Sequence, residues 1–101
     1  MLATSDIQTR LRDVKTRTAA ALQTSEGDAG ASVVLVAVVR EFDTKTDKAL
    51  GSAETRDAVI ELEQAGDSAK AAVEADTGAS ADTNAAVQDA HLAICILKTE
   101  V

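Results

Sequence analysis

The residues best suited to chemistry in this chain lie near its C-terminal end and recur at helical spacing. His91 is the only histidine and Cys95 the only cysteine, and Asn84, Gln88 and Lys98 continue the same stripe along one edge of a helix. An imidazole and a thiol one turn apart could hold two corners of a zinc tetrahedron, and a twofold axis could supply the other two. Two ligands do not make a site, so the sequence predicts no metal site.

A second use of His91 would be phosphoryl relay. Histidine phosphotransfer domains are four-helix bundles with one exposed histidine on a helix face, and their active histidine is followed closely by Lys and Gly. Here the apolar run 92–97 follows, and the lysine comes only at Lys98. The likeness is therefore at the level of the fold, and it leaves a regulatory or signalling domain as the alternative function.

Familiar catalytic and cofactor-binding motifs are missing from the sequence. A single histidine and the lack of Gly-x-Ser-x-Gly argue against a Ser-His-Asp hydrolase, and no Glu-x-x-His pair supports a di-iron bundle. The glycine-containing segment 27–30 matches neither phosphate-binding fingerprint. The oxygen-rich segment 76–84 does not have the spacing of a calcium loop. We expect no catalytic residue, no cofactor and no enzymatic activity.

Composition narrows the class of partner. The net charge of −7 opposes binding to nucleic acid and to anionic lipid surfaces, and a single aromatic residue, Phe42, provides no platform for stacking bases. The N-terminus shows no secretory signal, and the longest apolar run, 33–39, is far shorter than a membrane span of about 20 residues. We expect a cytoplasmic protein with neither nucleic-acid nor membrane partners.

The elements that must position these residues are separated by glycine. Segments 27–30, 51–52 and 78–80 divide a chain without proline into four stretches of about twenty residues. Short connections make successive helices antiparallel, so we predict one all-α domain over 1–101, an up-down-up-down four-helix bundle. A helical hairpin that completes its bundle by dimerising is the alternative. The β-branched run 33–39 also resembles a buried strand, but no turn signal separates it from the helical segment that follows.

Capping residues predict where these helices begin and end. Ser5 and Ser52 are expected to cap the first and third helices, and the fourth is expected to start near Ser80 or Asp82. Gly51 is expected to end the second helix in a left-handed conformation. The predicted core follows three-four spacing; it comprises Ile7, Leu11, Val14, Thr18, Ala21 or Leu22, then Leu35, Val39, Phe42, Thr46, Ala49, then Thr55, Val59, Leu62, Gly66, Ala69, Val73, and finally Val87, Ala90, Ile94, Leu97 and Val101.

Two dense apolar blocks, 33–39 and 92–97, cover more than one face of their helices. A helix that is apolar on several sides needs neighbours on several sides, so these blocks indicate an interface with a partner. We expect an antiparallel twofold dimer whose interface brings together, from the two copies, Val34, Val36, Val38, Leu92 and Ile96.

The function predicted from the sequence is therefore association between proteins without catalysis, as a homo-oligomer or as a small adaptor or chaperone. The acidic segment 52–76, with two basic and seven acidic side chains, adds a variant of the regulatory alternative. That segment is either a solvated helix face or a docking surface for a basic partner.

Overall fold

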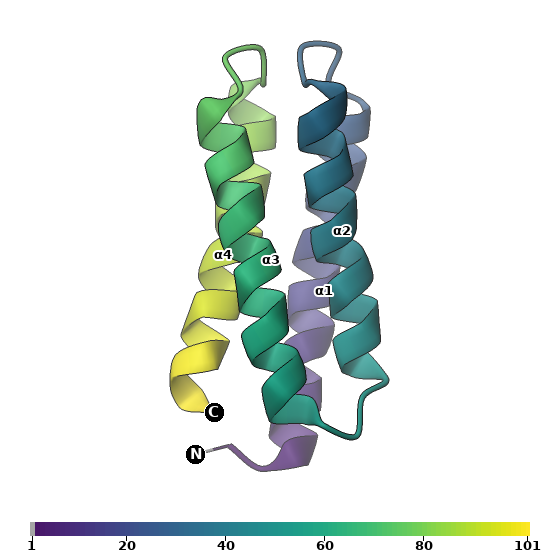
Figure 1. Cartoon of the computed structure of the whole chain (residues 1–101), viewed down its shortest axis with the longest axis vertical. Helices are drawn as coiled ribbons and strands as arrows, with labels where there is room; N and C mark the ends of the chain where they lie inside the picture. Colours follow the sequence, from purple (N-terminus) through teal and green to yellow (C-terminus); the bar gives the residue numbers. More distant parts are fainter. Residues whose placement is uncertain (1) are drawn as a thin grey trace.

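The computed structural model describes residues 2–101 and shows a four-helix bundle (Figure 1). The up-down-up-down prediction is confirmed. One chain brings all four helices together, so a hairpin that needs a second copy to complete its bundle is wrong. The run 33–39 begins the second helix, and no strand occurs within 2–101. The helices are α1 (Thr4–Glu26), α2 (Val33–Leu50), α3 (Thr55–Ala75) and α4 (Ala81–Glu100).

The helices form a ring in which each one packs against two neighbours. The neighbouring pairs are α1/α2, α2/α3, α3/α4 and α1/α4, so the groove between α2 and α3 and the groove between α1 and α4 lie on opposite sides of the bundle. The molecule measures 40 × 20 × 17 Å. Within residues 2–101, no helix is long and apolar enough to cross a membrane.

The core follows a strict alternation of three- and four-residue steps in every helix, which is the spacing that keeps one seam facing a neighbouring helix. The predicted seam is confirmed, with Ser25 and Thr83 added and Val101 only partly buried. Phe42 is the largest buried side chain. It packs over Gly66 of α3, where a Cβ would lie 3.2 Å from the Phe42 ring and 3.0 Å from Ile94 Cγ2.

Polar side chains in the core are all satisfied. Thr18 donates to an Asp43 carboxylate oxygen at 2.9 Å, and Thr46 donates to the Phe42 carbonyl at 2.9 Å. Among the described residues, no buried side-chain nitrogen or oxygen lacks a hydrogen-bond partner. The threonines therefore occupy core positions without the cost of an unpaired hydroxyl.

The α1–α2 and α3–α4 connections meet at one end of the bundle (Figure 1) and exchange hydrogen bonds. Asp28 accepts from the Ser80 amide at 2.8 Å and from the Thr83 hydroxyl at 2.7 Å, both at the start of α4. Asp76 accepts from the Ser32 amide at 2.9 Å, at the start of α2. Each carboxylate thus lies at the N-terminus of a helix in the other hairpin, where the helix dipole favours negative charge.

Glycine makes this exchange possible through close approach. A Cβ on Gly30 would clash with the carbonyl oxygen of Gly78, and a Cβ on Gly78 would clash with that of Gly30. The two connections carry the same pattern, Asp-x-Gly-Ala-Ser, at 28–32 and 76–80. The shared pattern explains why the two turns have similar structures and fit together.

The predicted caps are confirmed only in part. Gly51 does cap the C-terminus of α2, but the left-handed conformation is wrong, because its φ is −94° and its ψ 0°, and no glycine within 2–101 has a positive φ. Ser5 lies inside α1, which begins one residue earlier without a side-chain cap. Ser52 accepts from the Glu54 amide at 3.1 Å, before α3 begins. Ser80 does cap α4 by accepting from the Thr83 amide.

Candidate functional site

The largest exposed aliphatic side chains of α4 border the groove between α1 and α4. Leu92 is 58% exposed and Ile96 is 46% exposed. Because they are one helical turn apart, they form a continuous apolar surface. Val14 and Ala93 also line this shallow groove, which encloses about 290 Å³.

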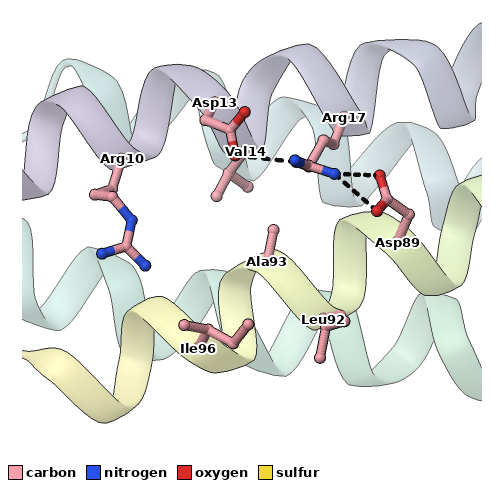
Figure 2. A pocket seen from close by; sticks show the side chains of 8 residues that line it. All are labelled: Arg10, Asp13, Val14, Arg17, Asp89, Leu92, Ala93 and Ile96. Atoms are coloured by element: carbon pink, nitrogen blue, oxygen red, sulfur yellow. Dashed lines mark hydrogen bonds and ion pairs between the residues drawn. The ribbon is translucent and has the colours of Figure 1, made fainter.

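Ion pairs between α1 and α4 flank this surface. Figure 2 shows the Arg17 guanidinium between Asp13 of its own helix and Asp89 of α4. The guanidinium contacts both Asp89 oxygens, at 2.6 and 2.7 Å, and Asp13 at 3.0 Å. The hydrogen bond to Asp13 has the largest effect on the pKa of Arg17, followed by those to Asp89, and both raise it. At the other end of the groove, Arg10 pairs with Glu100 at 2.5 Å. Both charge signs therefore surround the apolar centre.

A second apolar groove lies on the opposite side, between α2 and α3. Val34 is 70% exposed there, and Val38 and Ala65 also line the groove. Lys45 crosses it to reach Glu61 at 2.5 Å. This hydrogen bond raises the pKa of Lys45 and lowers that of Glu61.

The residues predicted to form one interface do not share one face. Val34 and Val38 line the α2/α3 groove, whereas Leu92 and Ile96 border the α1/α4 groove on the opposite side. Val36 lies between Val34 and Val38 in the sequence, but it borders a different groove, which Ser25 and Arg40 also line. A single twofold contact uses one face of each copy. The expected cross-pairing of the two apolar blocks therefore does not fit this arrangement.

A polar cluster lies between α3 and α4. His91 Nε2 is 2.7 Å from Asp67 Oδ1, and Cys95 Sγ is 3.3 Å from the same nitrogen. The three ligand atoms all lie within 4.8 Å of one another. The His91 side chain is only 14% exposed, whereas that of Asp67 is 58% exposed. The cluster is thus enclosed on the α4 side and open to solvent on the α3 side.

Charged pairs surround this cluster. Lys98 donates to Glu63 at 3.1 Å on one side, and Lys70 donates to Glu74 at 3.0 Å on the other. Burial raises the pKa of the Cys95 thiol, and the negative charges of Asp67 and Glu63 raise it further. At neutral pH the free thiol is therefore protonated.

These contacts bear on the regulatory alternative. His91 Nε2 is held by the Asp67 carboxylate, and a neighbouring negative charge repels a phosphoryl group. Much of the acidic face of α3 is also engaged within the chain, because Glu61, Glu63 and Glu74 each pair with a lysine. No specific observation favours phosphoryl relay or an acidic docking surface.

The sequence missed the position of Asp67, although a signal was present. Along much of α3 and α4, residues that directly follow a core residue contact one another across the α3/α4 groove, as Glu63 does with Lys98 and Glu74 with Gln88. Asp67 follows Gly66 in this way, and His91 follows Ala90. Which flank of α3 faces α4 depends on how the bundle turns, and the core spacing alone does not specify that.

Comparison of the chain with protein-family models, curated proteins and solved structures found no match.

Proposed function

We propose that this protein is a non-enzymatic helical bundle that acts by associating with a second copy of itself through its α1/α4 face. The observation that carries the proposal is the pair Leu92 and Ile96, two large aliphatic side chains that lie one turn apart and are each about half exposed. Adjacent apolar side chains left in water are an unfavourable surface, and contact with a matching surface removes them from water.

Charge opposes contact between two copies less at this face than at the acidic faces of the bundle. The protein carries a net charge of −7, so two copies repel one another. Within α3, two basic side chains stand against five acidic ones. Around the α1/α4 groove, two basic side chains, Arg10 and Arg17, stand against three acidic ones, Asp13, Asp89 and Glu100. The repulsion between copies is therefore smaller across the α1/α4 face than across any face that includes α3.

A twofold contact at this face is self-complementary. An axis that crosses α4 near Ile94 would place Leu92 of one copy opposite Ile96 of the partner subunit, and the reverse. Removing the exposed half of four such side chains from water contributes about 1 kcal/mol each. The four together correspond to roughly a thousandfold in dissociation constant.

The test compares three proteins by sedimentation equilibrium over a concentration series. The wild type should show a monomer–dimer equilibrium. The variant Leu92→Gln/Ile96→Gln should dissociate at concentrations about a thousandfold higher, if it associates at all. The control Val33→Gln/Val34→Gln removes exposed aliphatic side chains near the opposite groove, and it should behave as the wild type does.

Far-UV circular dichroism should give the same helical content for all three proteins, because every changed side chain is exposed. A wild type that remains monomeric throughout the series refutes self-association. A loss of association confined to the Val33/Val34 variant contradicts the assignment to the α1/α4 face and points to the α2/α3 groove.

A further inference from the structure

We propose that Asp67, His91 and Cys95 form a binding site for a transition-metal dication, with Zn²⁺ as the best fit, within a single chain. The sequence offered only the two ligands on α4, and the bundle adds a carboxylate from α3. The inference does not depend on self-association, because the α3/α4 groove is a different surface from the α1/α4 face.

The geometry is close to that of a tetrahedral site. Bonds of about 2.0–2.3 Å to nitrogen, oxygen and sulfur place neighbouring ligand atoms about 3.5 Å apart. His91 Nε2 now lies 3.3 Å from Cys95 Sγ and 2.7 Å from Asp67 Oδ1. Side-chain movements of about 1 Å would therefore admit an ion at the centre.

The scaffold holds the ligands in place. His91 and Cys95 are four residues apart on one helix, the same spacing that positions two zinc ligands in helical metal-binding motifs. Asp67 directly follows Gly66, whose missing side chain allows α3 to approach Ile94 of α4 closely. Ligands on two packed helices need little ordering when an ion binds.

The donor set selects the kind of ion. A thiolate and an imidazole suit zinc and its neighbours in the transition series, whereas magnesium and calcium prefer oxygen ligands alone. Coordination replaces the proton of the Cys95 thiol, which passes to solvent, and the thiolate and carboxylate together balance the charge of a dication. The open side at Asp67 leaves the fourth position to water.

Cobalt titration provides the test, because Co²⁺ substitutes for Zn²⁺ and a cobalt–thiolate bond has its own charge-transfer absorption. The wild type should bind one Co²⁺ per chain with this band, and added Zn²⁺ should displace the cobalt. Cys95→Ser should abolish the band. His91→Gln and Asp67→Asn should each weaken binding at least tenfold, whereas the control Asp57→Asn, on the exposed face of α3, should not.

The variant Leu92→Gln/Ile96→Gln should bind cobalt as the wild type does, which separates this proposal from self-association. The site is refuted if no saturable binding with a thiolate band appears, or if binding survives Cys95→Ser and His91→Gln together, since the ion would then be held by the acidic surface. A stoichiometry of one ion per two chains contradicts a site within one chain. Unchanged circular dichroism of the exposed-site variant Asp67→Asn shows that its loss of binding is not a loss of fold.

Discussion

The contact between Phe42 and Gly66 gives the sharpest quantitative prediction about the core. Gly66 is buried in the middle of α3, and a Cβ at this position would lie 3.0 Å from Ile94 Cγ2 and 3.2 Å from Phe42 Cζ. Alanine improves helix propensity by about 1 kcal/mol. Overpacking a well-filled core costs about 1–3 kcal/mol. Because Phe42 and Ile94 are both fully buried and have little room to move, we expect Gly66→Ala to lower the free energy of unfolding by about 1 kcal/mol.

Replacing the Phe42 ring by a smaller side chain should reverse the destabilising effect of Gly66→Ala. Phe42→Leu alone leaves a cavity and should cost about 1–2 kcal/mol. In that background the new Cβ gains space, so Gly66→Ala should be neutral or stabilising. The double-mutant cycle should therefore show a favourable coupling of about 1–2 kcal/mol.

The assay is urea unfolding followed by far-UV circular dichroism, because the chain has no Trp or Tyr to report by fluorescence. All four proteins should be compared at one concentration, since association adds to apparent stability. If Gly66→Ala stabilises the otherwise unchanged protein by the full propensity gain, or if the two substitutions are additive, the close contact of Gly66 with Phe42 does not exist.

Three further predictions concern the connections and the ion pairs. Hydrogen bonds from Ser80, Thr83 and Gly30 lower the pKa of Asp28 from 3.8 to about 2; the unfolded state therefore binds more protons between these values, and the free energy of unfolding should fall as the pH is lowered from about 4 to 2. Asp28→Asn should reduce that slope in acid unfolding curves, and an unchanged slope would contradict the role of this carboxylate. Gly78→Ala should destabilise the protein strongly because its Cβ meets the Gly30 carbonyl, whereas Gly27→Ala, at φ −83° with contacts no closer than 3.5 Å, should be neutral or stabilising by about 0.5 kcal/mol; equal melting temperatures for the two variants would refute the close approach. Arg17→Lys should lower stability by at most about 1 kcal/mol in thermal melts, since exposed ion pairs contribute little, and a larger loss would show that the Arg17 bridge is more than a surface pair.

The core was predictable from the sequence, and the polar clusters were not. Three-four spacing identified seam positions as unlike as Thr18, Phe42 and Gly66, because a core helix must bury one stripe whatever residues occupy it. The partnership of Asp67 with His91 depends on which flanks of α3 and α4 face each other, and neighbours in space are not encoded by spacing within one helix. By contrast, the sequence did place two of the three ligands, His91 and Cys95, on one edge of α4, because that placement depends only on spacing within a single helix.

The helix ends likewise divide into contacts within one segment, which the sequence predicts, and contacts between distant segments, which it does not. Ser80 was correctly placed at the start of α4, because its hydroxyl needs only the amide three residues later. The exchange between Asp28 and Asp76 depends on two connections 48 residues apart in the chain meeting at one end of the bundle. The repeated pattern Asp-x-Gly-Ala-Ser was the available signal, and it gains a physical meaning only once the two hairpins lie side by side.

Two copies are proposed to meet through the α1/α4 face, and backbone amide chemical shifts recorded over a dilution series test this claim residue by residue. We expect concentration-dependent shifts in α4 around Leu92 and Ile96 and in α1 around Asp13 and Arg17, with the amides near Val34 and Ala65 unchanged. Shifts confined to the α2/α3 side, or spectra that do not change with concentration up to the millimolar range, would contradict the claim.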